Sequence, residues 1–571
     1  MNDTKALRTL WLEKAQEPTL HAELEKMTDE ECYEAFYTDL AFGTGGIRGV
    51  MGAGTNRMNI YVVARAAAGV GRMLLKKKDS PSVAIGYDCR HHSEEFARIS
   101  AGALAEQGVK VWIYPSLRPT PMVSFAVREK HCDAGIMITA SHNPAKYNGF
   151  KAYGPDGCQL DLEDSETVMQ VMETLDMFDC ISGRSFDDWV KDGRIEILGD
   201  DVDEAFDSAC LKVQQNPGIL EKSGLKVIYT PLHGAGNLPV RRVLKKAGLT
   251  RVSVVPEQEK PDGGFPTCPF PNPEIAQAME LGIEQMQKEN ADLLLATDPD
   301  SDRVGIALPG PNGPVLISGN QMGALLTQYL FSVREENHTL PEKPVLVKTV
   351  VTSPLSDRIV TSYGGEVRDV LTGFKFIGEQ IRLLEEAGEA DRYVLGFEES
   401  YGYLPGIHVR DKDAVSAGLL ICKMAAYYHK KGKTLLDVMK EIYTSYGYYL
   451  DAQANHYFEG SDGMKTMKGI MDRLLSNPPE EVGGTKVVEI RDYEAGVITK
   501  TETGEQRPTG LPSSRVLKLV LYNACSLTIR PSGTEPKIKL YYSAVSDKKK
   551  HAEELLDVLK KAGEELLSEA E

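Results

Sequence analysis

Short apolar runs alternate with longer amphipathic segments along most of the chain. The runs are rich in β-branched residues and have the length of buried strands, whereas the segments between them have helical periodicity. Three groups of runs follow one another: residues 83–88, 109–115 and 134–140; residues 225–231, 251–257 and 292–298; and residues 345–350, 365–371 and 392–398. This order is typical of α/β proteins and predicts three successive mixed α/β sheet domains.

Both ends of the chain differ from this middle part. Residues 5–40 predict short helices, and Thr28 and Glu31 form a capping box ahead of one of them. From about residue 446 the apolar runs follow closely, at 486–493, 515–522, 525–530 and 537–545, and a charged amphipathic helix is expected over 547–569. We therefore expect a smaller C-terminal α+β domain with an antiparallel sheet.

The composition of the 571 residues is that of a soluble globular protein, with a net charge of −18. This acidic balance argues against nucleic acid or an anionic membrane surface as a partner. No run approaches the roughly 18 apolar residues that a membrane helix needs, and the charged N-terminus lacks a signal-peptide apolar region. The nine cysteines include no C-x-x-C pair, so we expect a reducing, cytoplasmic location.

Loops rich in polar and charged residues follow the third run of each group. They read SHNP (141–144), DPDSDR (298–303) and EES (398–400). Ligands of open α/β sheets bind beyond the carboxyl ends of the strands, so three such loops are expected to border one central cleft. An ordinary turn would explain any one of these loops, but it explains all three poorly.

The second of these loops predicts a metal site. Asp298, Asp300 and Asp302 alternate just after an apolar run, and in a tight turn three carboxylates can converge on one hard cation. The loop is not an EF-hand, because Arg303 and Pro309 stand where that motif has glycine and glutamate. A solvated acidic turn is the alternative, but three acids beside a buried strand would repel one another. Magnesium suits such oxygen ligands best.

Ser141 follows an apolar run, which puts its hydroxyl in a strand-end loop. Taken alone, a serine before His-Asn-Pro is more often a turn or a helix cap than a nucleophile, and no G-x-S-x-G elbow surrounds it. A phosphate on this serine would add about −1.5 to −2 charges. Such a group would be drawn to a metal held by the aspartate loop.

Two further loops suit a phosphorylated sugar. RPSGTEPK (530–537) offers the guanidinium of Arg530 for a phosphate, with hydroxyls and backbone N–H groups from Ser532, Gly533 and Thr534. An ordinary hairpin loop is the alternative. GFEES (396–400) offers Glu398, Glu399 and Ser400 as acceptors for sugar hydroxyls, although paired acids also occur in glycosidases. The chain contains neither a Walker loop nor a dinucleotide-binding fingerprint.

The four loops together, TASHNP, D-x-D-x-D-R, the glutamate–serine loop and R-x-S-G-T-E-P, resemble those of the α-D-phosphohexomutase superfamily, in that family's order. The resemblance extends from about residue 42 to 545. FGTGGIRGVMG and GFEESYGY are similar to the phosphoglucomutase branch, which includes bacterial enzymes and animal phosphopentomutase-like proteins.

This resemblance implies four domains around one cleft. We expect domain I, with the phosphoserine loop, at 1–205; domain II, with the metal loop, at 206–318; domain III, with the sugar loop, at 319–445; and domain IV, with the phosphate loop, at 446–571. It also implies a phosphorylated Ser141 and one Mg²⁺ bound by that residue, Asp298, Asp300 and Asp302. Glucose 1,6-bisphosphate would be the intermediate and activator as phosphate moves between C1 and C6.

The resemblance assigns weaker roles to further residues. Arg48, His142 and Lys151 would lie near the transferred phosphate, where one acts as general acid or base. The substrate would also contact Arg303 next to the metal aspartates, Thr372, Gly373 and Lys375 in the recognition loop LTGFKFIGE, and Lys412 in RDKD. For each lysine, a solvated surface charge is the alternative.

The expected reaction is that of a phosphoglucomutase acting on small sugar phosphates, by a monomer or homodimer. Phosphopentomutase, phosphomannomutase and glucose 1,6-bisphosphate synthase are the alternatives within the family. A non-catalytic sugar-phosphate sensor would need neither the serine nor the three aspartates. Glu399 favours glucose, because dual-specificity relatives often carry methionine at this position.

Overall fold

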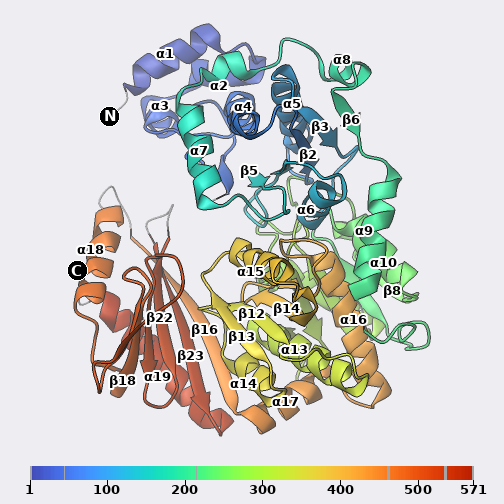
Figure 1. Cartoon of the computed structure of the whole chain (residues 1–571), viewed down its shortest axis with the longest axis vertical. Coiled ribbons are helices and arrows are strands. Elements are labelled where there is room, and N and C mark those ends of the chain that lie inside the picture. Colours follow the sequence, from blue (N-terminus) through green and yellow to red (C-terminus); the bar gives the residue numbers. More distant parts are fainter. Residues whose placement is uncertain (1–2, 44, 214, 459–462, 533–536, 569–571) are drawn as a thin grey trace. The chain divides into compact units, whose positions relative to one another are not determined.

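The computed structural model describes residues 3–43, 45–213, 215–458, 463–532 and 537–568 (Figure 1). The chain divides into two compact units. The first comprises residues 1–319 and 377–432, and the second comprises residues 320–376 and 433–571. This is a coarser division than the four expected domains, whose boundaries stay predictions.

The N-terminal helices of the first unit form a small core of their own. They are α1 (Thr4–Lys14), α2 (Pro18–Lys26) and α3 (Asp29–Phe36). The predicted capping box at Thr28 and Glu31 begins α3. Trp11 lies edge-on to Phe36 and Tyr61, with ring centroids 5.7 and 5.6 Å apart. Since Tyr61 belongs to α4 (Ile60–Lys77), the three helices are anchored on the domain that follows.

A six-stranded mixed sheet comes next, in the order β1-β5-β4-β2-β3-β6. β2 lies parallel to β3 and β4, whereas β1 and β5 are antiparallel additions at one edge. The predicted runs 83–88, 109–115 and 134–140 correspond to the parallel strands. The elements are β1 (Gly46–Val50), β2 (Ser82–Tyr87), α5 (Ser93–Glu106), β3 (Lys110–Ile113), α6 (Thr120–Glu129), β4 (Ala134–Ile138), β5 (Tyr147–Tyr153), α7 (Leu162–Glu173), α8 (Phe186–Lys191), β6 (Ile195–Ile197) and α9 (Asp200–Val213).

The second sheet of this unit has five strands in the order β11-β10-β9-β7-β8. β7 pairs in parallel with β8 and β9, and β10 and β11 continue the sheet in antiparallel fashion. The elements are β7 (Val227–Thr230), α10 (Asn237–Lys246), β8 (Val252–Val254), α11 (Pro256–Glu259), α12 (Ala276–Glu289), β9 (Leu293–Thr297), β10 (Val304–Leu308) and β11 (Val315–Ile317). This mixed topology confirms the predicted α/β class.

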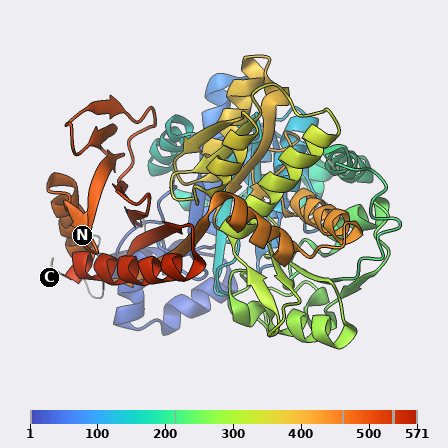
Figure 2. The same cartoon turned by 90° about the horizontal axis from the view of Figure 1, so that it is seen from below.

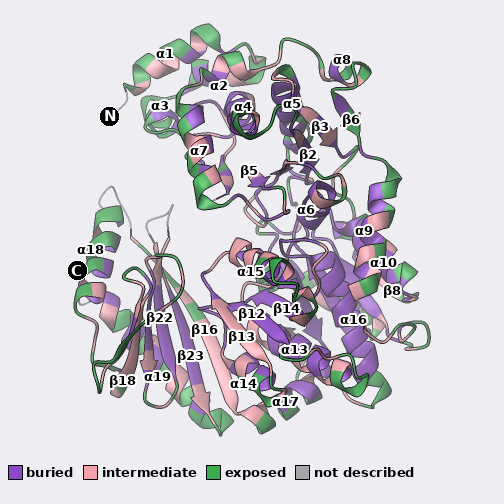
Figure 3. Cartoon of the chain, in the orientation of Figure 1, coloured by how far each residue is buried: buried purple, intermediate pink, exposed green. Residues whose placement is uncertain are grey.

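A buried helix completes the first unit. α16 (Ala414–Lys430) is buried along residues 414–428 and packs against α9 and α10 (Figure 3). Its single interior charge, Lys423, donates hydrogen bonds to the carbonyls of Gln215 and Asn216. The antiparallel pair β14 (Tyr393–Glu398) and β15 (Gly402–Leu404) precedes this helix. None of the helices in the described ranges is long and apolar enough to cross a membrane.

The second unit contains a parallel strand pair and the C-terminal sheet. β12 (Val345–Thr349) lies parallel to β13 (Glu366–Val370). The helices of this unit are α13 (Gly319–Glu336), α14 (Leu355–Ser362) and α17 (Leu435–Tyr446), whereas α15 (Phe374–Glu386) begins in it and continues into the first unit. The C-terminal sheet is antiparallel, in the order β16-β23-β22-β21-β18-β19-β20, with β17 paired to β18.

The C-terminal sheet is covered by helices. α19 packs against β16 and β23, and Figure 2 shows it as the long red helix. The elements are β16 (Tyr448–Tyr457), α18 (Gly463–Ser476), β17 (Glu481–Val482), β18 (Thr485–Asp492), β19 (Val497–Lys500), β20 (Gln506–Pro508), β21 (Leu517–Leu521), β22 (Ser526–Pro531), β23 (Lys537–Ser546) and α19 (Lys549–Ser568). This arrangement confirms the expected smaller α+β domain with an antiparallel sheet.

Candidate active site

Ser141 lies just beyond the carboxyl end of β4, in a strained backbone conformation. Its φ angle is 52°, in the left-handed region that a non-glycine residue rarely adopts. The backbone N–H donates to Thr139 Oγ1 at 2.8 Å, which supports this conformation. The side chain is buried, and Oγ donates to Asp298 Oδ2 at 3.0 Å. The serine loop of the first sheet thus meets the aspartate loop of the second.

A buried arginine holds the serine loop in shape. The guanidinium of Arg90 donates to the backbone carbonyls of Ser141, Asn143, Pro144 and Tyr147. Asp88 lies behind it, with Oδ2 at 3.3 Å from Arg90 Nε and both side chains fully buried. Four carbonyl oxygens pointing at one place would repel one another without this cation. Arg90 therefore fixes the turn that presents the Ser141 hydroxyl.

The three aspartates follow β9 and are almost completely buried. Each offers a carboxylate oxygen within 4.8 Å of those of the other two. Burial and the two neighbouring carboxylates raise the pKa of Asp298. Oδ1 of Asp300 and Oδ1 of Asp302 accept no hydrogen bond within the described part of the chain. Buried carboxylate oxygens without donors fit a hard divalent cation, so the residues present suit Mg²⁺.

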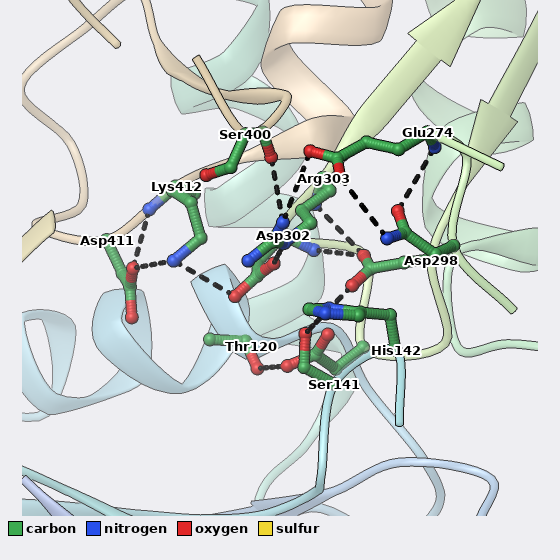
Figure 4. A network of polar contacts seen from close by, with 12 residues as sticks. Thr120, Ser141, His142, Glu274, Asp298, Asp302, Arg303, Ser400, Asp411 and Lys412 are labelled. Carbon is green, nitrogen blue, oxygen red and sulfur yellow. Dashed lines mark hydrogen bonds and ion pairs between the residues drawn. The ribbon is translucent and has the colours of Figure 1, made fainter. Parts of the chain in front are cut away.

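Two buried lysines balance the charge of these acids. Lys151 Nζ lies 2.8 Å from Asp300 Oδ2 and 3.2 Å from Asp302 Oδ2. Lys412 Nζ lies 3.2 Å from Asp302 Oδ2 and 3.1 Å from Asp411 Oδ1 (Figure 4). Burial opposes the charge of Lys412, but Asp302 and Asp411 outweigh it and raise its pKa. Both lysine side chains are at most 13% exposed, so neither is a solvated surface charge.

Two hydrogen bonds from Thr120 hold Asp300 in place. Thr120, at the first turn of α6, donates from its backbone N–H to the Asp300 carbonyl at 2.8 Å. Its Oγ1 donates to Asp300 Oδ2 at 2.7 Å. Burial works against the charge on Asp300, but Lys151 and the hydroxyl of Thr120 together lower its pKa. Because both donors occupy Oδ2, the other carboxylate oxygen is left for a cation.

Arg303 connects the aspartate loop with the sugar loop. Its Nη1 donates to the carbonyl of Ser400 at 3.0 Å and lies 3.8 Å from Glu274 Oε1. Figure 4 shows the guanidinium between the aspartates and Ser400. Glu398 is the last residue of β14 and is buried, and Glu399 and Ser400 follow it with partly exposed side chains. The sugar loop therefore lies on the same side of the first unit as Ser141.

Two of the predicted residues flank the serine. Nδ1 of His142 lies 3.1 Å from Ser141 Oγ. Burial, together with Arg303 and Arg48, lowers the pKa of His142 well below its usual value, so the ring is neutral near pH 7. Arg48 lies on β1, is exposed, and donates from Nη1 to Asn143 Oδ1 at 3.2 Å. A neutral ring beside the hydroxyl is suited to accepting a proton.

Comparison with known proteins identifies the family. Residues 39–178, 208–310 and 318–446 match the α/β/α domains I, II and III of phosphoglucomutase/phosphomannomutase. The chain belongs to this family, within the α-D-phosphohexomutase superfamily. The phosphoglucomutase of Staphylococcus haemolyticus (strain JCSC1435) is 39% identical over 512 residues, which cover 89% of this chain and 91% of that protein. The phosphoglucomutase of Staphylococcus aureus (strain USA300) is 37% identical over 540 residues, which cover 94% of this chain and 95% of that protein.

Solved structures of the family share the fold. The open form of parafusin, a phosphoglucomutase of Paramecium, has a TM-score of 0.70 at 16% identity, covering 93% of this chain and 96% of that chain. A phosphoglucomutase/phosphomannomutase family protein from Burkholderia thailandensis has a TM-score of 0.67 at 19% identity, covering 93% of this chain and 97% of that chain. At these identities the likeness concerns the fold alone.

The remaining predicted residues of this family member lie in the second unit. Thr372 and Gly373 follow β13, and Gly373 has a φ of 126° that favours glycine. Lys375 is half-buried at the start of α15. Arg530 lies near the end of β22, and the backbone N–H of Ser532 donates to the Lys537 carbonyl at 2.8 Å. Gly533 and Thr534 lie outside the described residues. That these loops meet those of the first unit at one cleft stays a prediction.

Sequence reasoning missed several residues that shape the site. Asp88 is the last residue of the predicted run 83–88 and Arg90 follows two positions later, so the rule that ligands bind at strand carboxyl ends would have found them. Thr120 and Glu274 have no such signal. Thr120 begins α6 and Glu274 precedes α12, and their importance follows only from the partners that folding brings to them.

Proposed function

We propose that this protein is a phosphoglucomutase that interconverts α-D-glucose 1-phosphate and glucose 6-phosphate through a phosphoserine at residue 141. The observation that carries the proposal is the 3.0 Å hydrogen bond from Ser141 Oγ to Asp298 Oδ2, beside two further buried carboxylates. A phosphate here would carry about −1.5 to −2 charges, which the acids alone would repel. Mg²⁺ held by Asp298, Asp300 and Asp302 would neutralise this charge when bound.

Each half of the reaction is a phosphoryl transfer. The free hydroxyl of the sugar phosphate attacks the phosphorus on Ser141, and its O–P bond forms as the Oγ–P bond breaks. The proton that the sugar hydroxyl loses is balanced by the one that Oγ regains. We propose that His142, neutral and 3.1 Å from Oγ, exchanges this proton. The resulting glucose 1,6-bisphosphate then returns its other phosphate to the serine, so that phosphate moves between C1 and C6.

Positioning and charge account for most of the catalysis in such transfers. Arg90 holds the serine turn, while Lys151 and Lys412 set the charge around the aspartates. We further propose that Thr372, Gly373 and Lys375 help to recognise the substrate. Arg530, Ser532, Gly533 and Thr534 would hold the phosphate that is not being transferred.

The proposed preference for glucose rests on the sugar loop and on the relatives. Glu398 and Ser400 would accept the 3- and 4-hydroxyls, which glucose and mannose present alike. Glu399 is typical of glucose-type members. A pentose would lack part of this hydroxyl pattern and leave acceptors without donors, which weakens binding.

A mutase assay tests the proposal. The purified protein is supplied with the 1-phosphates of glucose, mannose and ribose, each with a trace of the matching bisphosphate, and the rate of product formation is compared. We expect glucose 1-phosphate to give the highest kcat/KM. A tenfold advantage for ribose or mannose would contradict the glucose assignment, and no turnover of any of the three would contradict the mutase assignment.

Ser141→Ala tests the covalent step. The substitution removes one oxygen from a buried site, so the fold should persist while turnover is abolished. Intact-mass analysis should show a population heavier by one phosphate in the wild type and none in the variant. A fully active Ser141→Ala enzyme would exclude the phosphoserine mechanism.

A further inference from the structure

A second cluster of metal-ligating side chains lies in the first unit, apart from the three aspartates. Cys210 comes from the last turn of α9, His408 from the segment between β15 and α16, and Asp413 from the N-cap of α16. Cys210 is 1% exposed, Asp413 is fully buried, and the His408 side chain is 8% exposed. The ring of Phe206 lies 6.0 Å from that of His408 and shields the cluster on one side.

The three ligand atoms converge on one point. His408 Nε2 lies 2.9 Å from Asp413 Oδ2, and Cys210 Sγ lies 3.9 Å from that nitrogen and 4.0 Å from that oxygen. In a triangle with these sides, the point equidistant from the corners is about 2.1 Å from each atom. Zinc binds nitrogen and oxygen at about 2.0–2.2 Å and sulfur at about 2.3 Å. An ion slightly above the plane of the triangle would match all three distances.

The geometry differs from that of a catalytic cysteine triad. In such a triad the thiol and the carboxylate lie at opposite nitrogens of the imidazole ring. Here both face Nε2, which carries at most one proton and cannot serve two partners as a donor. The contact between His408 and Asp413 is the shortest of the three, and the Cys210 thiol lies at the long limit of a sulfur hydrogen bond, 4.0 Å from Asp413 Oδ2. Convergence of three donors on one point is the arrangement of a metal ligand set.

The donor types select the ion. Sulfur and imidazole favour zinc, whereas the aspartates at the active site offer oxygen only and suit magnesium. A neutral histidine, a carboxylate and a thiolate together balance two positive charges. The Cys210 thiol would release its proton to solvent on binding. The carboxylate of Asp413 is already oriented, because its Oδ1 accepts hydrogen bonds from the N–H groups of Val415 and Ser416. Its Oδ2 therefore faces the cluster.

We propose that Cys210, His408 and Asp413 form a zinc-binding site. Such a site would tie α9 to the segment that leads into α16. That segment carries Lys412, whose Nζ lies 3.2 Å from Asp302 Oδ2. A bound ion on Asp413 would therefore restrict the movement of the neighbouring Lys412. The site does not depend on the phosphoglucomutase assignment, and its test involves no turnover.

Metal titration of the full-length, metal-free protein tests the site. Mg²⁺ in large excess occupies the aspartate loop, and Zn²⁺ is titrated against a chromophoric chelator. Co²⁺ is then used as a spectroscopic probe, since thiolate ligation gives a near-ultraviolet charge-transfer band that oxygen ligands cannot give. We expect one zinc ion per chain and a cobalt–thiolate band.

Three variants and one control complete the design. His408→Gln, Asp413→Asn and Cys210→Ser should each weaken zinc binding at least tenfold, and Cys210→Ser should abolish the cobalt band. Asparagine caps helices as well as aspartate does, so Asp413→Asn should keep the fold if Cys210→Ser does not. Cys180→Ser, outside the cluster, should bind like the wild type. Absence of the band in the wild type, or unchanged zinc affinity in His408→Gln and Asp413→Asn, would overturn the proposal.

Discussion

Thr120→Val removes one hydrogen bond to the aspartate loop while almost preserving the shape of the side chain. Oγ1 of Thr120 donates to Asp300 Oδ2 at 2.7 Å, and both residues are fully buried. The backbone bond from Thr120 to the Asp300 carbonyl is unaffected by the substitution. The variant therefore isolates the contribution of the hydroxyl to the orientation of the carboxylate.

The size of the effect follows from the remaining partners. A hydrogen bond to a charged group contributes about 1.5–3 kcal/mol. Lys151 Nζ still reaches the same oxygen at 2.8 Å, so Asp300 stays paired and the lower end of this range applies. About 1.5 kcal/mol corresponds to roughly a tenfold change in an equilibrium constant. We expect the Mg²⁺ concentration needed for half-maximal activity to rise about tenfold.

The assay is the mutase rate over a series of Mg²⁺ concentrations after treatment with EDTA. Thr120→Ser is the matched control, because it restores the hydroxyl and removes only a methyl group. Thermal unfolding without metal shows whether the variants are folded. If Thr120→Val has the magnesium dependence of the wild type, or if Thr120→Ser is equally impaired, the hydroxyl does not position Asp300.

Three further predictions concern the rest of the molecule. EDTA should abolish activity and Mg²⁺ should restore it. Asp300→Asn should need a higher Mg²⁺ concentration for activity, because one ligand charge is lost. Wild-type rates for that variant at limiting Mg²⁺ would contradict the assignment of this loop as the metal site. Arg530→Ala should lower kcat/KM about ten- to a hundredfold, from the loss of about 1.5–3 kcal/mol of phosphate binding, and an unchanged value would place the phosphate elsewhere. Burial and the neighbouring Lys348 lower the pKa of Lys518 to about 8 from 10.5, so between these pH values the unfolded state binds more protons and stability rises with pH. Relative to Lys518→Met, the wild type should gain roughly 3 kcal/mol between pH 7 and 10.5 in denaturant unfolding, and a difference that is independent of pH would refute the assignment.

The local pattern of apolar and polar residues was sufficient to predict the central strands of the α/β part and the loops that follow them, but not strands such as β1, β5 and β10. β4 is apolar along its whole length and β9 is apolar up to Thr297, so the polar residues that come next must lie beyond the strand ends. Ser141 and the three aspartates could therefore be placed in strand-end loops from their neighbours alone. The family resemblance added the roles, which no spacing could supply.

Tertiary structure decided which partners surround these residues. Thr120 contacts Asp300 across 180 positions of sequence, and Arg90 reaches the serine loop across more than 50. No periodicity encodes such pairs, because they depend on how two sheets pack. The burial of the lysines could not be predicted from the sequence either. A lysine is normally solvated, and Lys151 and Lys412 are buried only because the fold places carboxylates beside them. Sequence thus determined where reactive groups leave the strands, whereas packing determined their charge, their orientation and their neighbours.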